Sequence, residues 1–184
     1  TASAIYKDTI LVKESAWSKA AISRNEVMQG TPSEKKVDYH KGINRPIHYN
    51  SKLYKGYMAG GMNALLDGYR GGLTYLDGRW QGYLNDLDCV VDMGEKTDLH
   101  KVSVRFMQLT GPGVFQPGEV SLLTSEDGVN FTLQQTIKPV VPQEESNLTF
   151  QEYTFQGNWK GRFVRLQASE VNNGFIFADE IVIW

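Results

Sequence analysis

The chain has 184 residues, of which 41% are hydrophobic and 22% are charged, and its formal net charge is −2. This length and composition are typical of a folded domain with a sizeable core. The sequence has no lysine- and arginine-rich run and no apolar run of the roughly 20 residues that span a bilayer, so we expect neither a nucleic-acid partner nor a membrane partner.

The N-terminal part of the sequence differs in character from the rest. No signal peptide opens the chain, so we expect a mature segment or an excised piece of a longer protein. Residues 1–30 contain two short strand-like runs, and two strands alone are marginally stable. We therefore expect residues 1–30 to be the tail of a preceding small β-domain, or strands that lean on the main one. Turn residues then predict a linker at 31–46 and a main module at 47–184.

The main module has a period-two pattern. Residues 100–109 alternate, and residues 118–137 read as two strands around a tight turn at Asp127-Gly128. Residues 148–155, 161–169 and 175–184 are three further strand-like segments, and no amphipathic helical stretch of a dozen residues is present. This pattern predicts an all-β protein, an antiparallel β-sandwich. The single cysteine, Cys89, lies in an apolar run and is expected to be a buried thiol.

An ordered series of short motifs carries a resemblance to known domains. The motifs are ALLDG (64–68), WQGY (80–83), VVDMG (90–94), VSVRF (102–106), VSLLTSEDGVNF (120–131), RFVRLQA (162–168) and FADEIVI (177–183). In this order they resemble the discoidin or coagulation-factor type C domains and the related family 32 carbohydrate-binding modules, over about residues 45–184. The resemblance implies a jelly-roll, galactose-binding-domain-like sandwich.

Two longer segments point to a narrower group. Residues 59–84, AGGMNALLDGYRGGLTYLDGRWQGYL, and residues 106–120, FMQLTGPGVFQPGEV, are similar to the C-terminal modules of bacterial, chitobiase-like β-N-acetylhexosaminidases of family 20. Residues 3–21 are similar to the end of the small β-domain that follows the catalytic barrel of those enzymes. The resemblance implies that the chain is the C-terminal piece of a larger glycosidase, because 184 mostly strand-like residues cannot hold a barrel of ~250 residues.

The same resemblance implies a structural calcium ion beneath the binding loops. Its ligands would be the side chains of Asp67 and Glu180, with backbone oxygens near Ala64 and Asp179, and calcium prefers such oxygen ligands. Three residues after Asp67, where the family often carries Asn or Asp, this chain has Arg70. The sequence leaves three alternatives open: a bound calcium ion, a cluster in which Arg70 pairs with Asp67 or Glu180, or solvated acids.

Aromatic residues in the loops predict a sugar site. A sugar ring offers apolar C–H faces and a rim of hydroxyls, so a site needs aromatic side chains and a few planar polar groups. The candidates are Tyr69, Arg70, Tyr75, Arg79, Phe115, Asn173 and Phe175. The alternative is that these aromatic side chains cap the sandwich, and Trp80 is expected to pack near the base of the site.

No motif predicts catalysis by this chain. The three histidines, His40, His48 and His100, have no metal-ligand spacing, and no nucleophile or phosphate-binding motif is present. We expect a non-catalytic accessory module of a secreted, periplasmic or cell-surface bacterial glycoside hydrolase. Its expected partners are glycans that contain galactose or an N-acetylhexosamine and the catalytic domain of the parent enzyme. The alternatives are a structural module that packs against the catalytic domain without binding sugar, and an enzyme in its own right.

Overall fold

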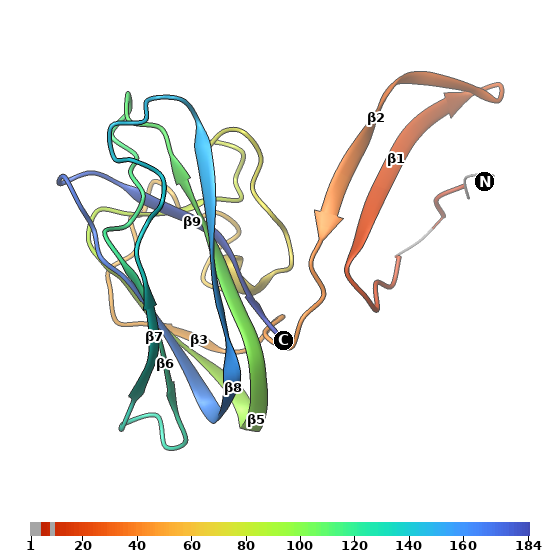
Figure 1. Cartoon of the computed structure of the whole chain (residues 1–184). Helices are drawn as coiled ribbons and strands as arrows, with labels where there is room; N and C mark the ends of the chain where they lie inside the picture. The colour runs from red at the N-terminus through yellow and green to blue at the C-terminus, as the bar shows by residue number, and fades with distance from the viewer. Residues whose placement is uncertain (1–4, 8–9) are drawn as a thin grey trace.

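The computed structural model describes residues 5–7 and 10–184. These residues form a two-stranded hairpin and a β-sandwich (Figure 1). The elements in chain order are β1 Ala16–Arg24, β2 Val27–Val37, β3 Ile47–Tyr49, the 3₁₀ turn η1 Ala64–Leu66, β4 Gln81–Tyr83, β5 Leu87–Gln108, β6 Val120–Ser125, β7 Thr132–Ile137, β8 Thr149–Ala168 and β9 Ile176–Ile183. The prediction of an all-β antiparallel fold is confirmed.

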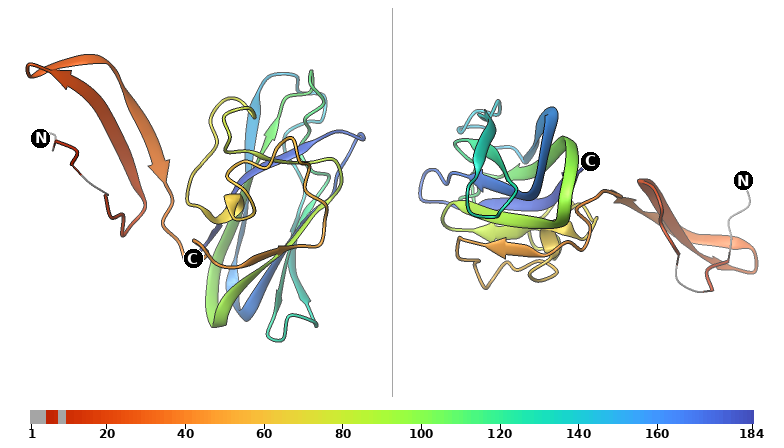
Figure 2. Two further views of the ribbon diagram at one scale, coloured as in Figure 1. Left: turned by 180° about the vertical axis from the view of Figure 1, so that it is seen from behind. Right: turned by 90° about the horizontal axis from the view of Figure 1, so that it is seen from below.

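The β1–β2 hairpin lies beside the sandwich, as both views of Figure 2 and Figure 1 show. Its strands pair from Ala16↔Val37 to Arg24↔Val27. The turn residues Asn25 and Glu26 both have positive φ angles, 50° and 64°, which is the backbone geometry of a tight hairpin turn. All nine side chains of β1 are exposed to solvent. The hairpin therefore contributes little to the apolar core.

One strand of the hairpin extends beyond residue 30. Strand β2 continues to Val37, into the segment 31–46 that the sequence analysis expected to be a linker. The sequence hides this strand because its side chains are exposed on both faces, so the alternation of a half-buried strand is absent. Of the first expected strand-like run, residues 5–7 and 10–13 are not in a strand, and residues 8–9 and 1–4 lie outside the described residues.

Two long strands, β5 and β8, join the two layers of the sandwich. They pair with each other from Leu87↔Ala168 to Gln108↔Thr149, with a register shift between Asp92 and Thr97. The first half of β5 and the second half of β8 lie in one layer with β3, β6 and β7, and the other halves lie in the second layer with β4 and β9. Gly94 has a φ of 83° at the bend, which only glycine adopts easily. The bend lies at the bottom of Figure 1.

The core lies between the two layers and follows the period-two pattern. Val102, Val104 and Phe106 of β5 are fully buried in it, whereas Ser103 and Arg105 face the outer side of their layer. Cys89 is buried in the same core, as predicted, and burial raises the pKa of its thiol to about 12. Within the part of the chain that the structure describes, no helix is long and apolar enough to cross a membrane.

Candidate functional site

The glycine-rich segment 64–84 covers the outer face of the layer that contains β9 and the second half of β5. Trp80 is buried beneath it, stacks on Phe150 at 5.5 Å between ring centroids, and donates a hydrogen bond from Nε1 to the Gly72 carbonyl, 3.1 Å away. A Cβ atom on Gly71 would lie only 2.2 Å from Trp80 Nε1. The glycine is therefore needed because the backbone lies directly on the indole ring. Trp80 packs beneath the loop, as the sequence analysis expected.

An arginine-centred cluster fixes this segment to the sheet. Arg70 donates from Nε to Asp38 Oδ2 at 2.5 Å and from Nη2 to Glu152 Oε1 at 2.9 Å. Although burial opposes ionisation, hydrogen bonds from Arg70 and Lys36 lower the pKa of Asp38. Of the three alternatives, the one in which Arg70 pairs with Asp67 or Glu180 is wrong in its partners, since Arg70 pairs with Asp38 and Glu152. The reason is that residue 38 enters the sandwich beside the loop, which the sequence could not show.

A second arginine ties the same loop to β9. The carboxylate of the fully buried Asp179 accepts hydrogen bonds from Arg105 Nε at 2.8 Å and from the Gly71 backbone amide at 2.9 Å. The Arg105 guanidinium also lies 5.0 Å from the Trp80 ring centroid, in a cation–π arrangement. The Asp179 side chain therefore binds Arg105 and the glycine-rich segment together.

Asp67 and Glu180 form a separate acidic pair next to His40. Glu180 Oε1 accepts hydrogen bonds from His40 Nε2 at 2.8 Å and from the Gly68 amide at 3.0 Å. Among the residues that the structure describes, Glu180 Oε2 has no hydrogen-bond partner. His40 Nδ1 accepts from the Gly42 amide at 3.0 Å, so the ring proton is assigned to Nε2. Burial, reinforced by the nearby Asp67 carboxylate, raises the pKa of Glu180 to about 9, while burial lowers that of His40 to about 4.

Asp67 and Glu180 lie at the place where the family resemblance implies a calcium ion. Within the described ranges, no group of three or more Asp, Glu, His or Cys side chains is arranged to hold a metal ion. The two neighbouring carboxylates would supply part of the six to eight oxygen ligands that calcium prefers, and Arg79 Nη1 lies 3.5 Å from Asp67 Oδ2. Because Arg70 is engaged by Asp38 and Glu152, its guanidinium is not paired with this acidic pair.

Aromatic side chains gather at the end of the sandwich opposite the bend. Phe175 precedes β9 and contacts Tyr54 and Tyr57 edge-on, with ring centroids 5.1 and 5.4 Å apart. Tyr75 from the glycine-rich segment meets Tyr57 edge-on at 5.7 Å. Phe115 joins the group through a backbone hydrogen bond from its amide to the Phe175 carbonyl, 2.9 Å away. Segments far apart in the sequence thus build one aromatic cluster.

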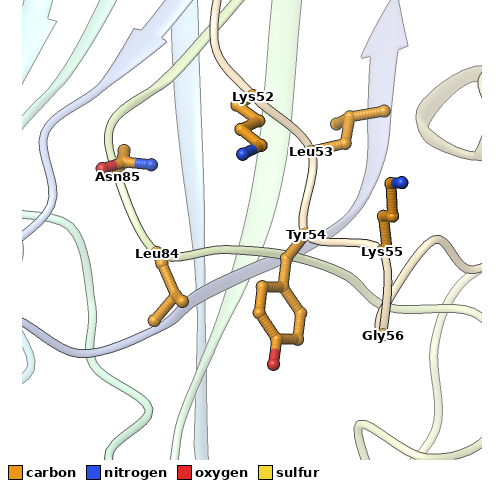
Figure 3. Close-up of a pocket in the computed structure, with 7 residues that line it drawn as sticks. All are labelled: Lys52, Leu53, Tyr54, Lys55, Gly56, Leu84 and Asn85. Atoms are coloured by element: carbon orange, nitrogen blue, oxygen red, sulfur yellow. The ribbon is translucent and has the colours of Figure 1, made fainter.

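A cavity of about 550 Å³ opens beside this cluster (Figure 3). Residues 52–56 line one side of it, and Leu84 and Asn85 line the other. The Tyr54 ring is 40% exposed while its edge packs on Phe175. In Figure 3 the side-chain ends of Lys52 and Asn85 face one another across the gap. The cavity therefore combines an aromatic ring held in place with amine and amide groups, which are the groups that recognise hydroxyl-rich ligands.

The predicted ligand residues fall into two groups. Tyr75 and Phe175 belong to the aromatic cluster, the Phe115 amide is bonded to the Phe175 carbonyl, and Asn173 lies in the loop before Phe175. Of these four, Phe175 contacts a residue that lines the cavity, Tyr54. Tyr69 and Arg79 lie together beside Asp67, with the guanidinium 4.5 Å from the tyrosine ring centroid, and Arg70 belongs to the arginine cluster. Tyr75 and Phe175 also pack against the buried Phe177, so part of the alternative interpretation holds: these rings cap the sheet.

Sequence reasoning missed the residues that line the cavity most directly. Tyr54, Lys52 and Lys55 lie in a segment without a recognised motif, between β3 and η1. One signal was available, since NSKLYKGY (residues 50–57) places aromatic and basic residues around a glycine. Such a composition alone does not tell which loop end it occupies, because that depends on the pairing of β3 with β5.

Comparisons with known proteins found similar structures but no similar sequence family. No protein-family profile matches the sequence, and no curated protein matches it significantly. The chain is similar to a fucose binding module of Streptococcus pneumoniae (TM-score 0.56, 11% identity, 79% of this chain and 94% of that one). It is also similar to chitosan-binding module 1 of a chitosanase/glucanase from Paenibacillus sp. IK-5 (TM-score 0.54, 12% identity, 79% and 98%). A third similar structure, CpGH89CBM32-5 from Clostridium perfringens in complex with GalNAc-β-1,3-galactose, has a TM-score of 0.50 and 19% identity over 77% and 95%.

These similarities cover most of this chain and nearly the whole of each of the three modules. At identities below 20% they concern the fold, because one fold carries many functions. The chain therefore has the galactose-binding-domain-like antiparallel β-sandwich of these carbohydrate-binding modules.

Proposed function

We propose that the chain is a non-catalytic carbohydrate-binding accessory module of a glycoside hydrolase. The observation that carries the proposal is the cavity at the loop end, where the exposed Tyr54 ring is fixed against Phe175 beside Lys52, Lys55 and Asn85. The similar modules of known structure support the same ligand class, since the printed names of three of them refer to fucose, chitosan and GalNAc-β-1,3-galactose.

The finer proposal concerns the ligand and the parent enzyme. The motif resemblance of residues 59–84 and 106–120 favours glycans ending in galactose or an N-acetylhexosamine, and a secreted, periplasmic or cell-surface bacterial β-N-acetylhexosaminidase. Binding by one shallow site is expected to be weak. Its value to an enzyme is the raised local concentration of substrate near the catalytic domain.

A structural calcium ion is part of this proposal. Asp67 and Glu180 would hold it together with backbone oxygens near Ala64 and Asp179, and it would supply a fixed positive charge that joins the glycine-rich segment to β9. Its effect on sugar binding would be indirect, through the position of the loops.

A second candidate function is a structural role against a catalytic domain. Its support is the β1–β2 hairpin, on which Trp17, Ile22 and Met28 are 65%, 74% and 57% exposed. Exposed apolar side chains of this size are typical of a surface that another protein covers. The two functions are compatible, because the hairpin and the loop-end cavity use different parts of the chain.

A glycan array tests the proposed function. The full chain is applied with and without calcium, beside Tyr54→Ala and Phe175→Ala, and Tyr39→Ala serves as the control because Tyr39 is a 50% exposed tyrosine in the connection after β2. We expect binding to glycans ending in galactose or an N-acetylhexosamine, reduced about tenfold or more in Tyr54→Ala and unchanged in Tyr39→Ala. A blank array with well-folded protein would contradict sugar binding and favour the structural role.

A further inference from the structure

A second concave surface lies on the outer face of the layer formed by β3, β5, β8 and β6. It has a volume of about 510 Å³ and includes His48 of β3, Val90 of β5, and Phe163 and Arg165 of β8. These residues face outward because their neighbours Val91, Val164 and Leu166 point into the core. The turn between β6 and β7, with Val129 and Phe131, closes one side. None of the residues of this surface lines the loop-end cavity.

The polar groups of this surface are held rigidly. Arg165 makes a two-pronged contact with Asp88, from Nε to Oδ1 at 2.8 Å and from Nη2 to Oδ2 at 2.5 Å, and Asn50 Nδ2 donates to the same carboxylate at 3.1 Å. Within the described residues, no hydrogen bond uses Arg165 Nη1, the Asn50 side-chain oxygen or the His48 ring. Arg165 and Asn50 therefore present a donor and an acceptor to solvent from positions fixed by Asp88, which reduces the entropy lost on binding. The exposed His48 ring lies beside them.

The apolar groups lie next to these polar ones. The guanidinium of Arg165 is 5.4 Å from the Phe131 ring centroid, so the aromatic ring lies next to the planar guanidinium. Phe163 lies on the same face, and Val129 is 79% exposed at the rim. Aromatic side chains beside planar hydrogen-bonding groups match the two kinds of surface on a pyranose ring, its C–H face and its hydroxyl rim.

The charge of this surface narrows the ligand class. Arg165 is neutralised by Asp88, and the neighbouring Arg162 is neutralised by Asp92, with hydrogen bonds of 2.8 Å. The surface therefore carries no free cationic group that would favour a uronate, sulfate or phosphate. A neutral ligand with paired hydroxyl groups is the better match.

We propose that this face is a second carbohydrate-binding site, separate from the loop-end cavity, which takes a neutral pyranose residue. Phe131 and Phe163 contact the C–H face of the sugar, and Arg165, Asn50 and His48 bind its hydroxyls. The inference shares the ligand class of the proposed function but none of its residues. A chain with both sites binds two sugar units at once, which raises its affinity for a glycan-dense surface above that for a soluble monosaccharide.

Nuclear magnetic resonance of the isotopically labelled full chain separates the two sites. Methyl β-galactopyranoside and the methyl β-glycoside of N-acetylglucosamine are titrated while the His48 ring, the Asn50 side-chain amide and the Gly128 amide report on the sheet face. The Leu84 and Asn85 amides report on the loop end. The variants are Phe131→Ala, His48→Ala and Tyr54→Ala, with Leu133→Ala as a control because Leu133 is 57% exposed on β7 and does not line the surface.

The proposal expects saturable shifts of the sheet-face reporters with at least one of the two glycosides. These shifts persist in Tyr54→Ala and Leu133→Ala, and the sheet-face Kd weakens about tenfold in Phe131→Ala and in His48→Ala. The exposed His48 can be replaced without disturbing the core, so loss of folding in Phe131→Ala would not leave the test open. Shifts confined to the loop end overturn the second site and leave the proposed function standing. Shifts at neither place overturn both.

Discussion

Glu180 and His40 are a buried pair in which, without a bound cation, each group is held in its uncharged form. Burial raises the pKa of Glu180 to about 9 from an unfolded value of 4.5, so the folded chain binds a proton there that the unfolded chain has released. Stability from Glu180 is thus complete below pH 4.5 and is lost as the pH rises towards 9. The pKa of His40 is lowered from 6.5 to about 4, so its contribution is lost only as the pH falls below 6.5. Above pH 6.5 Glu180 alone of the two makes stability depend on pH.

The substitution Glu180→Gln tests this assignment. Glutamine keeps an oxygen for the Gly68 amide and cannot ionise, so the fall in stability between pH 6.5 and 9 should be smaller in the variant by about 1 kcal/mol or more. Chemical unfolding at several pH values in the presence of a chelator measures it. Glu144→Gln, at an exposed position, is the control and should follow the wild type. Equal pH profiles for all three proteins would show that Glu180 is ionised in the folded chain.

At the scale of elements, the glycine-rich segment packs on the sheet through one close contact, between the Gly71 backbone and the Trp80 ring. Gly71→Ala places a Cβ atom 2.2 Å from Trp80 Nε1, so either the loop or the indole must move. We expect a loss of about 1–3 kcal/mol in the free energy of unfolding, measured by denaturant titration. Gly111→Ala is the matched control, since its Cβ would meet nothing within 4 Å. A loss of the same size in both variants would mean that the contact with the indole ring does not cause the effect.

The predictability of the elements depends on how many of their faces are buried. Alternation predicted the second half of β5, the β6–β7 hairpin with its Asp127-Gly128 turn, and β9. The segments 148–155 and 161–169 were expected as separate strands but form the single strand β8, because the bend that joins them is made by pairing with β5. Strands β3 and β4 have three residues each, too few for a period to be read.

The candidate site was predicted less completely than the fold. Phe115, Asn173 and Phe175 were proposed as ligand residues because loops without a strand role carried aromatic and amide groups, and their role in binding stays a prediction. Arg70 was expected near Asp67 from its spacing, yet its partners Asp38 and Glu152 are 32 and 82 residues away along the chain. Contacts at such separations depend on strand pairing, so sequence spacing does not reveal them.

At the scale of the whole molecule, the hairpin and the sandwich differ in how far water reaches their backbone hydrogen bonds. Every side chain of β1 is exposed, whereas β9 is buried along its whole length. Isolated two-stranded hairpins are only marginally stable. Hydrogen exchange followed by mass spectrometry should therefore show rapid exchange in residues 16–37 and slow exchange in β5, β8 and β9. Equal protection of both parts would contradict a marginally stable hairpin.

The sharing of β5 and β8 between the two layers has a consequence for how the sandwich comes apart. Neither layer can open without breaking the ladder that the other layer also needs, because one continuous pair of strands serves both. The sandwich should therefore melt in one cooperative transition. A ligand that binds the folded state at the loop end raises the same melting temperature as one bound on the face of β3, β5, β8 and β6.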